Sequence, residues 1–149
     1  MKVKPASFNP ITQNLHKAVF FMDRAADHAL REKLNLTFSQ FRILLAVRKL
    51  GAITQQQAAK FHSLTPAAVS RQVEILKQRG LLAVKQNSQN RRMHFLSLTF
   101  GGKKQISSAV LLLDRLFSKM YLVLSPKEKQ GLEKALNKLA STINFPQHK

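Results

Sequence analysis

The sequence contains no cysteine and no tryptophan, and only seven of its 149 residues are acidic. Without cysteine, the chain cannot form disulfides, Cys-ligated zinc or iron–sulfur centres, or a thiol-based redox sensor. Seven carboxylates leave few candidates for general acid–base catalysis. No apolar run approaches the roughly 18 residues of a membrane span, and no apolar stretch follows the two lysines near the start. We therefore expect a cytoplasmic protein with no membrane partner, no cofactor and no metal.

Basic residues far outnumber acidic ones. Lys and Arg total 25, so the formal net charge is +18 and the pI is near 11.2. Residues 1–49 hold 9 basic and 3 acidic residues, 50–99 hold 7 and 1, and 100–149 hold 9 and 3. Each third has a net charge of +6, so the positive charge is not confined to a basic terminal tail. An excess of this size indicates a polyanionic partner, either nucleic acid or an anionic membrane surface.

Two long helices with heptad seams are predicted near the two ends of the chain. Asn9-Pro10 is typical of an N-cap with proline at the first helical position, and Asn35 is a plausible stop. Apolar residues then recur at spacings of 4 and 3 from Ile11 to Ala29 and again from Ile106 to Leu124. A capping box at Ser125–Glu128 predicts a last amphipathic helix. A single subunit cannot bury both seams, so we expect a homodimer.

The centre of the chain has the spacing of a helix-turn-helix. Capping boxes at Thr37–Gln40 and Thr54–Gln57 each predict the start of a helix, and Thr65-Pro66 predicts another that ends at Gly80. The second and third of these helices are short and lie roughly four residues apart. Beyond Gly80, the β-prone runs 82–85 and 93–98 flank a polar turn, which predicts a hairpin.

The helix that begins after Thr65 has two different faces. At 100° per residue, Val69, Val73 and Leu76 form a buried face, while Ser70 and Arg71 lie on the opposite side. Small residues near its start allow close approach, and Ser70 and Arg71 can reach base edges or phosphates. The arginines of the hairpin turn can enter a minor groove. The competing interpretation is a solvated amphipathic helix with an ordinary surface arginine.

Several segments together resemble the MarR family of winged helix-turn-helix transcriptional regulators. They are 54–59, 64–73 (Leu-Thr-Pro-Ala-Ala-Val-Ser-Arg-Gln-Val), 76–82, Asn90-Arg91-Arg92 and 96–99. The family usually has an aspartate where this chain has Asn90. The resemblance implies a mainly α fold with a small β-hairpin wing. Residues 1–35 and 100–149 would form a helical dimerisation domain, and residues 36–99 a winged helix-turn-helix DNA-binding lobe.

The resemblance also implies the function and the site residues. We expect sequence-specific binding to a pseudo-palindromic double-stranded operator by a homodimeric regulator, a repressor relieved by a small aromatic or anionic effector. No catalytic residue is expected. The predicted DNA-binding residues are Thr65, Pro66, Ala67, Ala68, Ser70, Arg71, Gln72, Asn90, Arg91 and Arg92. The predicted effector-binding residues are Phe20, Phe21, Phe41, Phe117 and Tyr121, and the competing interpretation, which the residues alone favour, is that all five belong to the core.

Two other function classes remain open. The first is an RNA- or nucleoid-binding winged-helix protein with little sequence preference, which the even spread of positive charge favours. Competition between specific and random duplex distinguishes it from a sequence-specific regulator. The second is a winged-helix module that binds proteins, which an unopposed basic surface does not favour. Loss of all nucleic-acid binding at low salt would support it.

Overall fold

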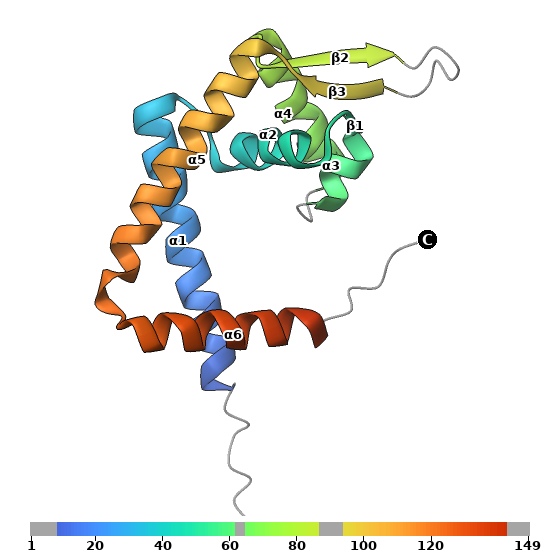
Figure 1. The fold of residues 1–149 in the computed structure, drawn as a ribbon. Helices are drawn as coiled ribbons and strands as arrows, with labels where there is room; N and C mark the ends of the chain where they lie inside the picture. The colour runs from blue at the N-terminus through green and yellow to red at the C-terminus, as the bar shows by residue number, and fades with distance from the viewer. Residues whose placement is uncertain (1–8, 62–64, 87–93, 143–149) are drawn as a thin grey trace, which may run out of the picture. The chain divides into compact units, whose positions relative to one another are not determined.

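A computed structural model describes residues 9–61, 65–86 and 94–142 of the chain (Figure 1). The elements in order are α1 (Pro10–Leu34), α2 (Phe38–Leu50), β1 (Ile53–Thr54), α3 (Gln55–Phe61), α4 (Pro66–Gln78), β2 (Leu82–Gln86), β3 (His94–Leu98), α5 (Phe100–Met120), the 3₁₀ turn η1 (Tyr121–Val123) and α6 (Pro126–Thr142). The predicted fold class, mainly α with a small hairpin, is confirmed. No helix within these described ranges is long and apolar enough to cross a membrane.

The chain divides into two compact units, Met1–Asp114 and Arg115–Lys149. The first unit contains α1 to α4, the three strands and the first part of α5, and the second contains the end of α5, η1 and α6. We predicted that residues 1–35 and 100–149 form a dimerisation domain and that residues 36–99 bind DNA. This assignment concerns the function of the segments and stays a prediction.

The predicted helix starts are confirmed by their capping hydrogen bonds. The backbone N–H of Ile11 donates to the Asn9 side chain at 2.8 Å. The Thr37 hydroxyl accepts from the backbone N–H of Gln40 at 3.1 Å, and the Gln40 side chain accepts from the backbone N–H of Thr37 at 3.0 Å. The same reciprocal pairs form between Thr54 and Gln57 and between Ser125 and Glu128. Each pair satisfies N–H groups that a helix start leaves unpaired.

The sheet has a third strand that the sequence did not predict. The strand order is β1-β3-β2, and both pairings are antiparallel. In β2 and β3, Val84 pairs with Leu96, and on the other side of β3 Ile53 pairs with the same Leu96. β1 is only two residues long, so it shows no alternating pattern in the sequence. It ties the start of α3 to the hairpin.

The core lies in the first unit, where α2, α3 and α4 gather against the sheet (Figure 1). The fully buried large side chains come from α1, the α1–α2 turn, α2, α4, β3 and α5, and they are Leu30, Leu36, Ile43, Leu44, Val69, Val73, Leu76, Leu96 and Ile106. The three α4 residues among them are the face predicted to be buried. Close packing of this face holds α4 rigidly, with its other side outward.

Asp27 joins the end of α1 to the start of α2. One of its carboxylate oxygens accepts a hydrogen bond from Nε of Arg31 at 2.6 Å, and the other accepts from the backbone N–H of Phe38 at 2.8 Å. Partial burial alone would raise the pKa of Asp27, but these hydrogen bonds and the Arg31 charge outweigh it and lower the pKa. Because the folded-state pKa is depressed, this stabilisation is present at neutral pH and is lost as the pH falls through that pKa.

Gly102 allows the start of α5 to pack directly on the chain that follows α4. A Cβ at this position would overlap the backbone carbonyl oxygen of Leu81, whereas a Cβ at Gly101 would meet only ordinary contacts. The Thr99 hydroxyl fixes the junction, because it donates to the Gly80 carbonyl at 2.6 Å and accepts from the Gly102 N–H at 2.9 Å. Gly102 is therefore a packing feature at the base of the hairpin.

Gly102→Ala should lower the free energy of unfolding by about 1–3 kcal/mol, the usual effect of overpacking against a backbone that cannot move. Gly101→Ala is the matched control, because it adds the same methyl group one residue away without a clash. It should be neutral or slightly stabilising, since alanine favours helix over glycine. Urea unfolding of both variants measures the difference. Equal stability of the two would contradict the packing role.

Candidate nucleic-acid interface

The first two turns of α4 form an exposed surface with small side chains. The hydroxyl of Thr65 accepts a hydrogen bond from the backbone N–H of Ala68 at 3.3 Å, and Pro66 occupies the first helical position, as predicted. Ala67, Ala68 and Ser70 are all exposed. Among the described residues, the side chains at this end of the helix are small, so a phosphate or a base edge can approach its backbone closely.

Arg71 is the cation of this surface. It is exposed on the face opposite Val69 and Val73, which are buried. No carboxylate in the described part of the chain lies within 4.0 Å of its guanidinium. Glu74 lies about one turn further along and is engaged by Lys77 at 3.7 Å and by the Gln78 amide at 3.3 Å. The Arg71 side chain can therefore meet an external acceptor without first breaking an internal ion pair.

Gln72 holds α4 against α2. Its side-chain oxygen accepts a hydrogen bond from Nε2 of Gln40 at 3.0 Å, and Gln72 itself is only half-exposed. Gln40 is 5% exposed and is the only buried polar residue among the described ones. Its own oxygen also accepts from the backbone N–H of Thr37 and, at 3.4 Å, from Arg79. A DNA contact by Gln72 stays a prediction, and its side-chain amide N–H groups are available for it.

The hairpin provides a second basic element beside α4. β2 packs against α4, and Lys85 and His94 are exposed at the ends of the two strands that lead to the turn. The predicted wing residues Asn90, Arg91 and Arg92 lie outside the described residues. Sequence reasoning did not single out Lys85, although its place in an alternating strand pattern could have shown that it points outward.

The residues predicted to bind an effector do not form one cluster in the first unit. Phe41 is 8% exposed and stacks on Phe38, with ring centroids 5.9 Å apart. Phe20 and Phe21 are each 55% exposed and form an edge-to-face pair at 5.5 Å. The other two predicted residues, Phe117 and Tyr121, belong to the second unit. Of the three in the first unit, only Phe20 and Phe21 form an aromatic pair with each other.

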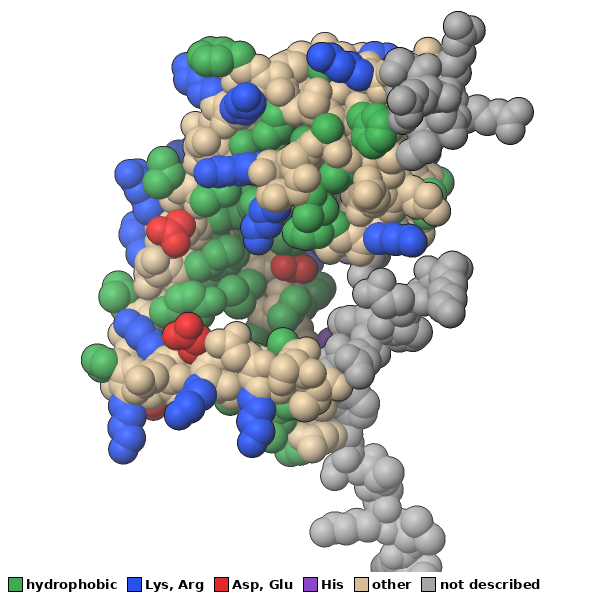
Figure 2. All heavy atoms as spheres, turned by 45° about the vertical axis from the view of Figure 1, so that its right-hand side comes forward, with side chains coloured by type: hydrophobic (Ala, Val, Ile, Leu, Met, Phe, Trp, Pro, Cys, Tyr) green, Lys and Arg blue, Asp and Glu red, His purple; other side chains and the backbone are tan. Residues whose placement is uncertain are grey.

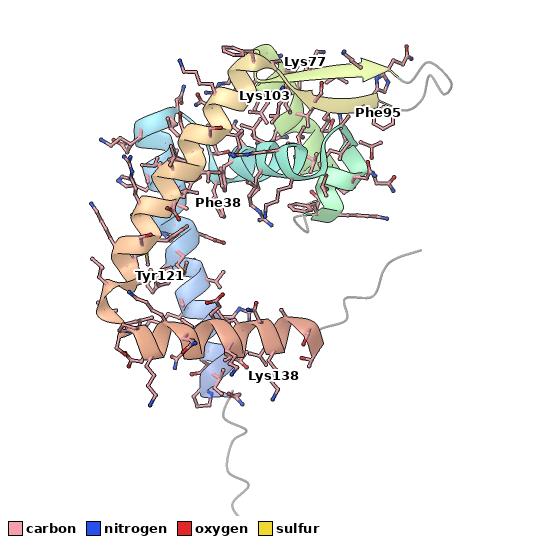
Figure 3. All side chains as sticks on the ribbon, in the orientation of Figure 1. Phe38, Lys77, Phe95, Lys103, Tyr121 and Lys138 are labelled. Atoms are coloured by element: carbon pink, nitrogen blue, oxygen red, sulfur yellow. The ribbon has the colours of Figure 1, made fainter. Side chains whose placement is uncertain are left out.

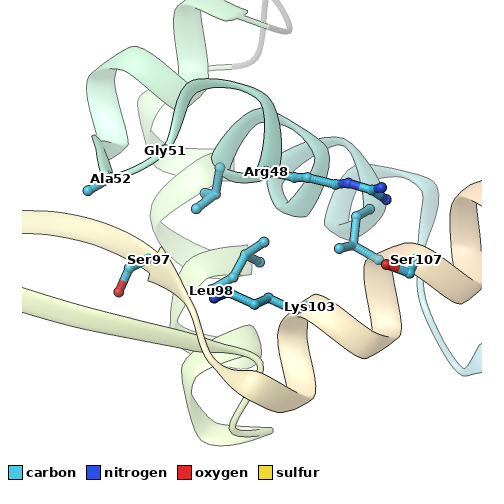
Figure 4. A pocket seen from close by; sticks show the side chains of 9 residues that line it. Arg48, Gly51, Ala52, Ser97, Leu98, Lys103 and Ser107 are labelled. Carbon is cyan, nitrogen blue, oxygen red and sulfur yellow. The ribbon is translucent and has the colours of Figure 1, made fainter.

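A cavity of about 500 Å³ opens in the first unit between the end of α2, the end of β3 and the start of α5 (Figure 4). Its lining residues are Val47, Arg48, Gly51, Ala52, Ser97, Leu98, Lys103, Ile106 and Ser107. Arg48 and Lys103 give it two cations, and none of the lining residues is acidic. The apolar wall, two cations and two hydroxyls suit a small anion that carries an apolar group. The sequence did not predict this cavity, because the end of α2 is far along the chain from β3 and α5, which follow each other directly.

No group of three or more His, Asp or Glu side chains in the described ranges could hold a metal ion. The pKa of Glu128 is lowered by its hydrogen bonds with Ser125, which is a consequence of helix capping. The geometry is that of a winged helix-turn-helix: a capped helix with an open N-terminal face, seated on a second short helix and flanked by a basic hairpin.

Comparison with known proteins identifies the class. The MarR family model matches residues 36–94. A helix-turn-helix-type transcriptional regulator of Bacillus subtilis, YhbI, is 24% identical over 127 residues, which are 83% of this chain and 82% of that protein. Wild-type MarR from E. coli, in its apo form, has a TM-score of 0.81 and 25% identity over 89% of this chain and 98% of its own. The predicted resemblance to the MarR family is thereby confirmed, by the family model over residues 36–94 and by the fold over most of the chain.

Two further structures bear on what such folds bind. A cysteine-to-serine variant of E. coli MarR complexed with operator DNA has a TM-score of 0.76 and 25% identity, covering 87% of this chain and 93% of its own. BpsR of Bordetella bronchiseptica has a TM-score of 0.77 and 25% identity, covering 95% of this chain and 100% of its own. The DNA binding of BpsR is regulated by 6-hydroxynicotinic acid.

Proposed function

We propose that the protein is a homodimeric transcriptional regulator, and not an enzyme, that binds a specific double-stranded operator in the cytoplasm. We propose further that it is a repressor, relieved by a small anionic effector. The observation that carries the proposal is the exposed N-terminal face of α4, where Arg71 lies on a helix locked in place by Val69, Val73 and Leu76. MarR bound to its operator supports the proposal, because the two folds match over most of both chains.

Selection of bound sequences from a random duplex pool tests this function. A two-fold dimer presents two recognition helices, so the enriched sequence should be a pseudo-palindrome with half-sites about one helical turn apart. Specific duplex should then compete far better than random duplex. A pool that shows no enrichment while binding persists would instead favour the second candidate, a nucleoid- or RNA-binding protein. The net charge of +6 in each third of the chain favours that candidate.

Arg71→Ala and Arg92→Ala should weaken binding in different ways. If Arg71 pairs with a guanine, its loss costs about 1–3 kcal/mol and relaxes the preference at one position per half-site. We expect Arg92, in the predicted wing, to sense groove width, so its loss should matter most on sites with A·T-rich flanks. Its contribution should be near about 1 kcal/mol, since Asn90 offers a weaker orienting bond than an aspartate would.

Binding profiles of both variants on a randomised operator measure this difference. Arg48→Ala is a suitable control, because it removes one cation from the rim of the cavity while leaving α4 and the hairpin turn intact. It should leave the sequence preference unchanged. Identical and uniform weakening by Arg71→Ala and Arg92→Ala would mean that both arginines only grip phosphates, which would refute base readout by Arg71.

For the effector, we expect aromatic carboxylic acids at millimolar concentration to raise the melting temperature by a few degrees. Binding at about ten times the dissociation constant adds about 1.4 kcal/mol of stability, which corresponds to about 3–5 °C for a domain of this size. If the cavity holds the ligand, Arg48→Gln with Lys103→Gln should abolish the shift. If the predicted phenylalanines hold it, Phe20→Ala with Phe21→Ala should abolish it instead. No shift with any acid would leave neither site supported.

A further inference from the structure

Helix α6 carries a row of lysines that the proposed function does not use. Lys127, Lys134 and Lys138 are separated by seven and four residues, so at 100° per residue they lie within about 40° of one another. All three are exposed. Lysine side chains stand out along α6 in Figure 2, and Figure 3 shows Lys138 extending from the helix.

The apolar side chains of α6 lie on the other side of the helix. Leu132, Leu136 and Leu139 fall within about 60° of one another, roughly 150° from the lysine row. Their side chains are 41%, 42% and 45% exposed, respectively. In the proposed dimer, a second subunit would cover the face that these three leucines form. Because the two faces are nearly opposite, covering the leucines leaves the lysines in solvent. Each dimer then presents two such rows.

The positive charge of this row is not neutralised within the helix. No described carboxylate lies within 4.0 Å of any of the three ammonium groups. Glu128 is occupied at the helix start, where it accepts hydrogen bonds from the Ser125 hydroxyl at 2.7 Å and from its backbone N–H at 2.8 Å. Glu133 projects about 100° away from the lysine row. The row is therefore a strip of unopposed positive charge.

We propose that the lysine row of α6 binds the phosphate backbone of a second DNA duplex, so that one dimer can hold two DNA segments together. From Lys127 to Lys138 the helix rises about 16 Å, and B-DNA of that length carries about ten phosphates. Lysine acts on phosphate as a point charge, so this contact does not depend on sequence. It goes beyond the proposed operator binding, which belongs to α4 and the hairpin.

An anionic membrane is the competing partner for a basic amphipathic helix. Binding in the plane of a membrane requires the apolar face to enter the lipid. In the proposed dimer the α6 leucines face the partner subunit, so only the charged row stays available. A lipid surface would then hold the row by charge alone, with about 1 kcal/mol per lysine, whereas a duplex places about ten phosphates along the row.

A bridging assay tests the proposal with the full-length protein. A biotinylated 40-base-pair duplex of random sequence on beads is incubated with protein and a second, fluorescent random duplex at low salt. The wild type should capture the second duplex. The triple variant Lys127→Gln, Lys134→Gln and Lys138→Gln should capture it at least about tenfold less, because two rows of phosphate contacts are lost. It should still bind the first duplex and remain a dimer by sedimentation.

The control variant removes three lysines from α1 and α5 instead: Lys33→Gln, Lys104→Gln and Lys119→Gln. Its net charge is the same as that of the α6 variant, but its lysine row on α6 is intact. We therefore expect the control variant to keep bridging. Equal loss in both variants, full bridging by the α6 variant, or capture of phosphatidylserine vesicles in place of the second duplex would each overturn the proposal. Because both duplexes are random, failure of sequence-specific binding would leave this result unaffected.

Discussion

Leu136→Asp should turn the protein into a monomer and weaken operator binding by about 10²–10⁴-fold. Leu136 is 42% exposed in the middle of the α6 leucine face, between Leu132 and Leu139. In the proposed dimer a carboxylate there would lose its water without gaining a partner, which costs several kcal/mol. A monomer has one recognition helix in place of two, and so loses the advantage of binding both half-sites together.

Asn137→Asp is the control for this substitution. It adds the same charge to the same helix one residue away, on a side that bears none of the three leucines. We expect the variant to remain a dimer with nearly unchanged affinity. Sedimentation velocity at micromolar concentration gives the oligomeric state, and anisotropy with the selected operator gives the affinity. A wild type that sediments as a compact and stable monomer would contradict the dimer.

Operator binding should be exceptionally sensitive to salt. A dimer with about twice the +18 charge of one chain should neutralise on the order of 8–12 phosphates, so the slope of log affinity against log salt should be about −7 to −11. Between 50 and 200 mM salt the affinity should then fall by about 10⁴-fold or more. The cause is the release of the cations that duplex DNA condenses around itself. In the proposed interface, the positive charges on α4 and on the strands of the hairpin displace some of these cations.

Titrating affinity against salt for the wild type and for Arg71→Ala measures this effect. If Arg71 grips phosphate, the variant's slope should be shallower by about 2, one unit for each subunit. If Arg71 reads a base, the slope should stay nearly the same while the affinity falls. A wild-type slope shallower than about −3 would mean that most of the positive charge faces away from the DNA, and it would contradict the proposed interface.

Local features of the fold could be predicted from the sequence, because they depend on neighbours three or four residues apart. Asn9, Thr37, Thr54, Thr65 and Ser125 each cap a helix with a hydrogen bond to the next turn, and the sequence pattern of each cap was recognisable. The end of the seam from Ile106 to Leu124 was predicted wrongly as part of one helix. α5 ends at Met120 and a 3₁₀ turn follows, although the apolar spacing continues to Leu124.

Features made by distant segments could not be predicted in this way. β1 has only two residues and exists because Ile53 pairs with Leu96, more than 40 positions away. The sequence predicted Gln40 as part of a capping box, which is confirmed, but the side-chain amide of Gln40 also donates to Gln72 on α4. The spacing of residues in the sequence cannot show that Gln40 and Gln72 are partners, because the two lie 32 residues apart.

The amino-acid sequence alone therefore determined the order of the helices and the hairpin, the face of α4 that turns outward and the positive charge of the chain, since periodicity, capping and composition are local properties. The tertiary structure alone decided that Gln72 is held by α2, that Gly102 must lack a side chain where α5 meets Leu81, and that Arg48 and Lys103 share one cavity. These are contacts between segments brought together by burial of a common core, and no pattern along the chain encodes which residues will meet there.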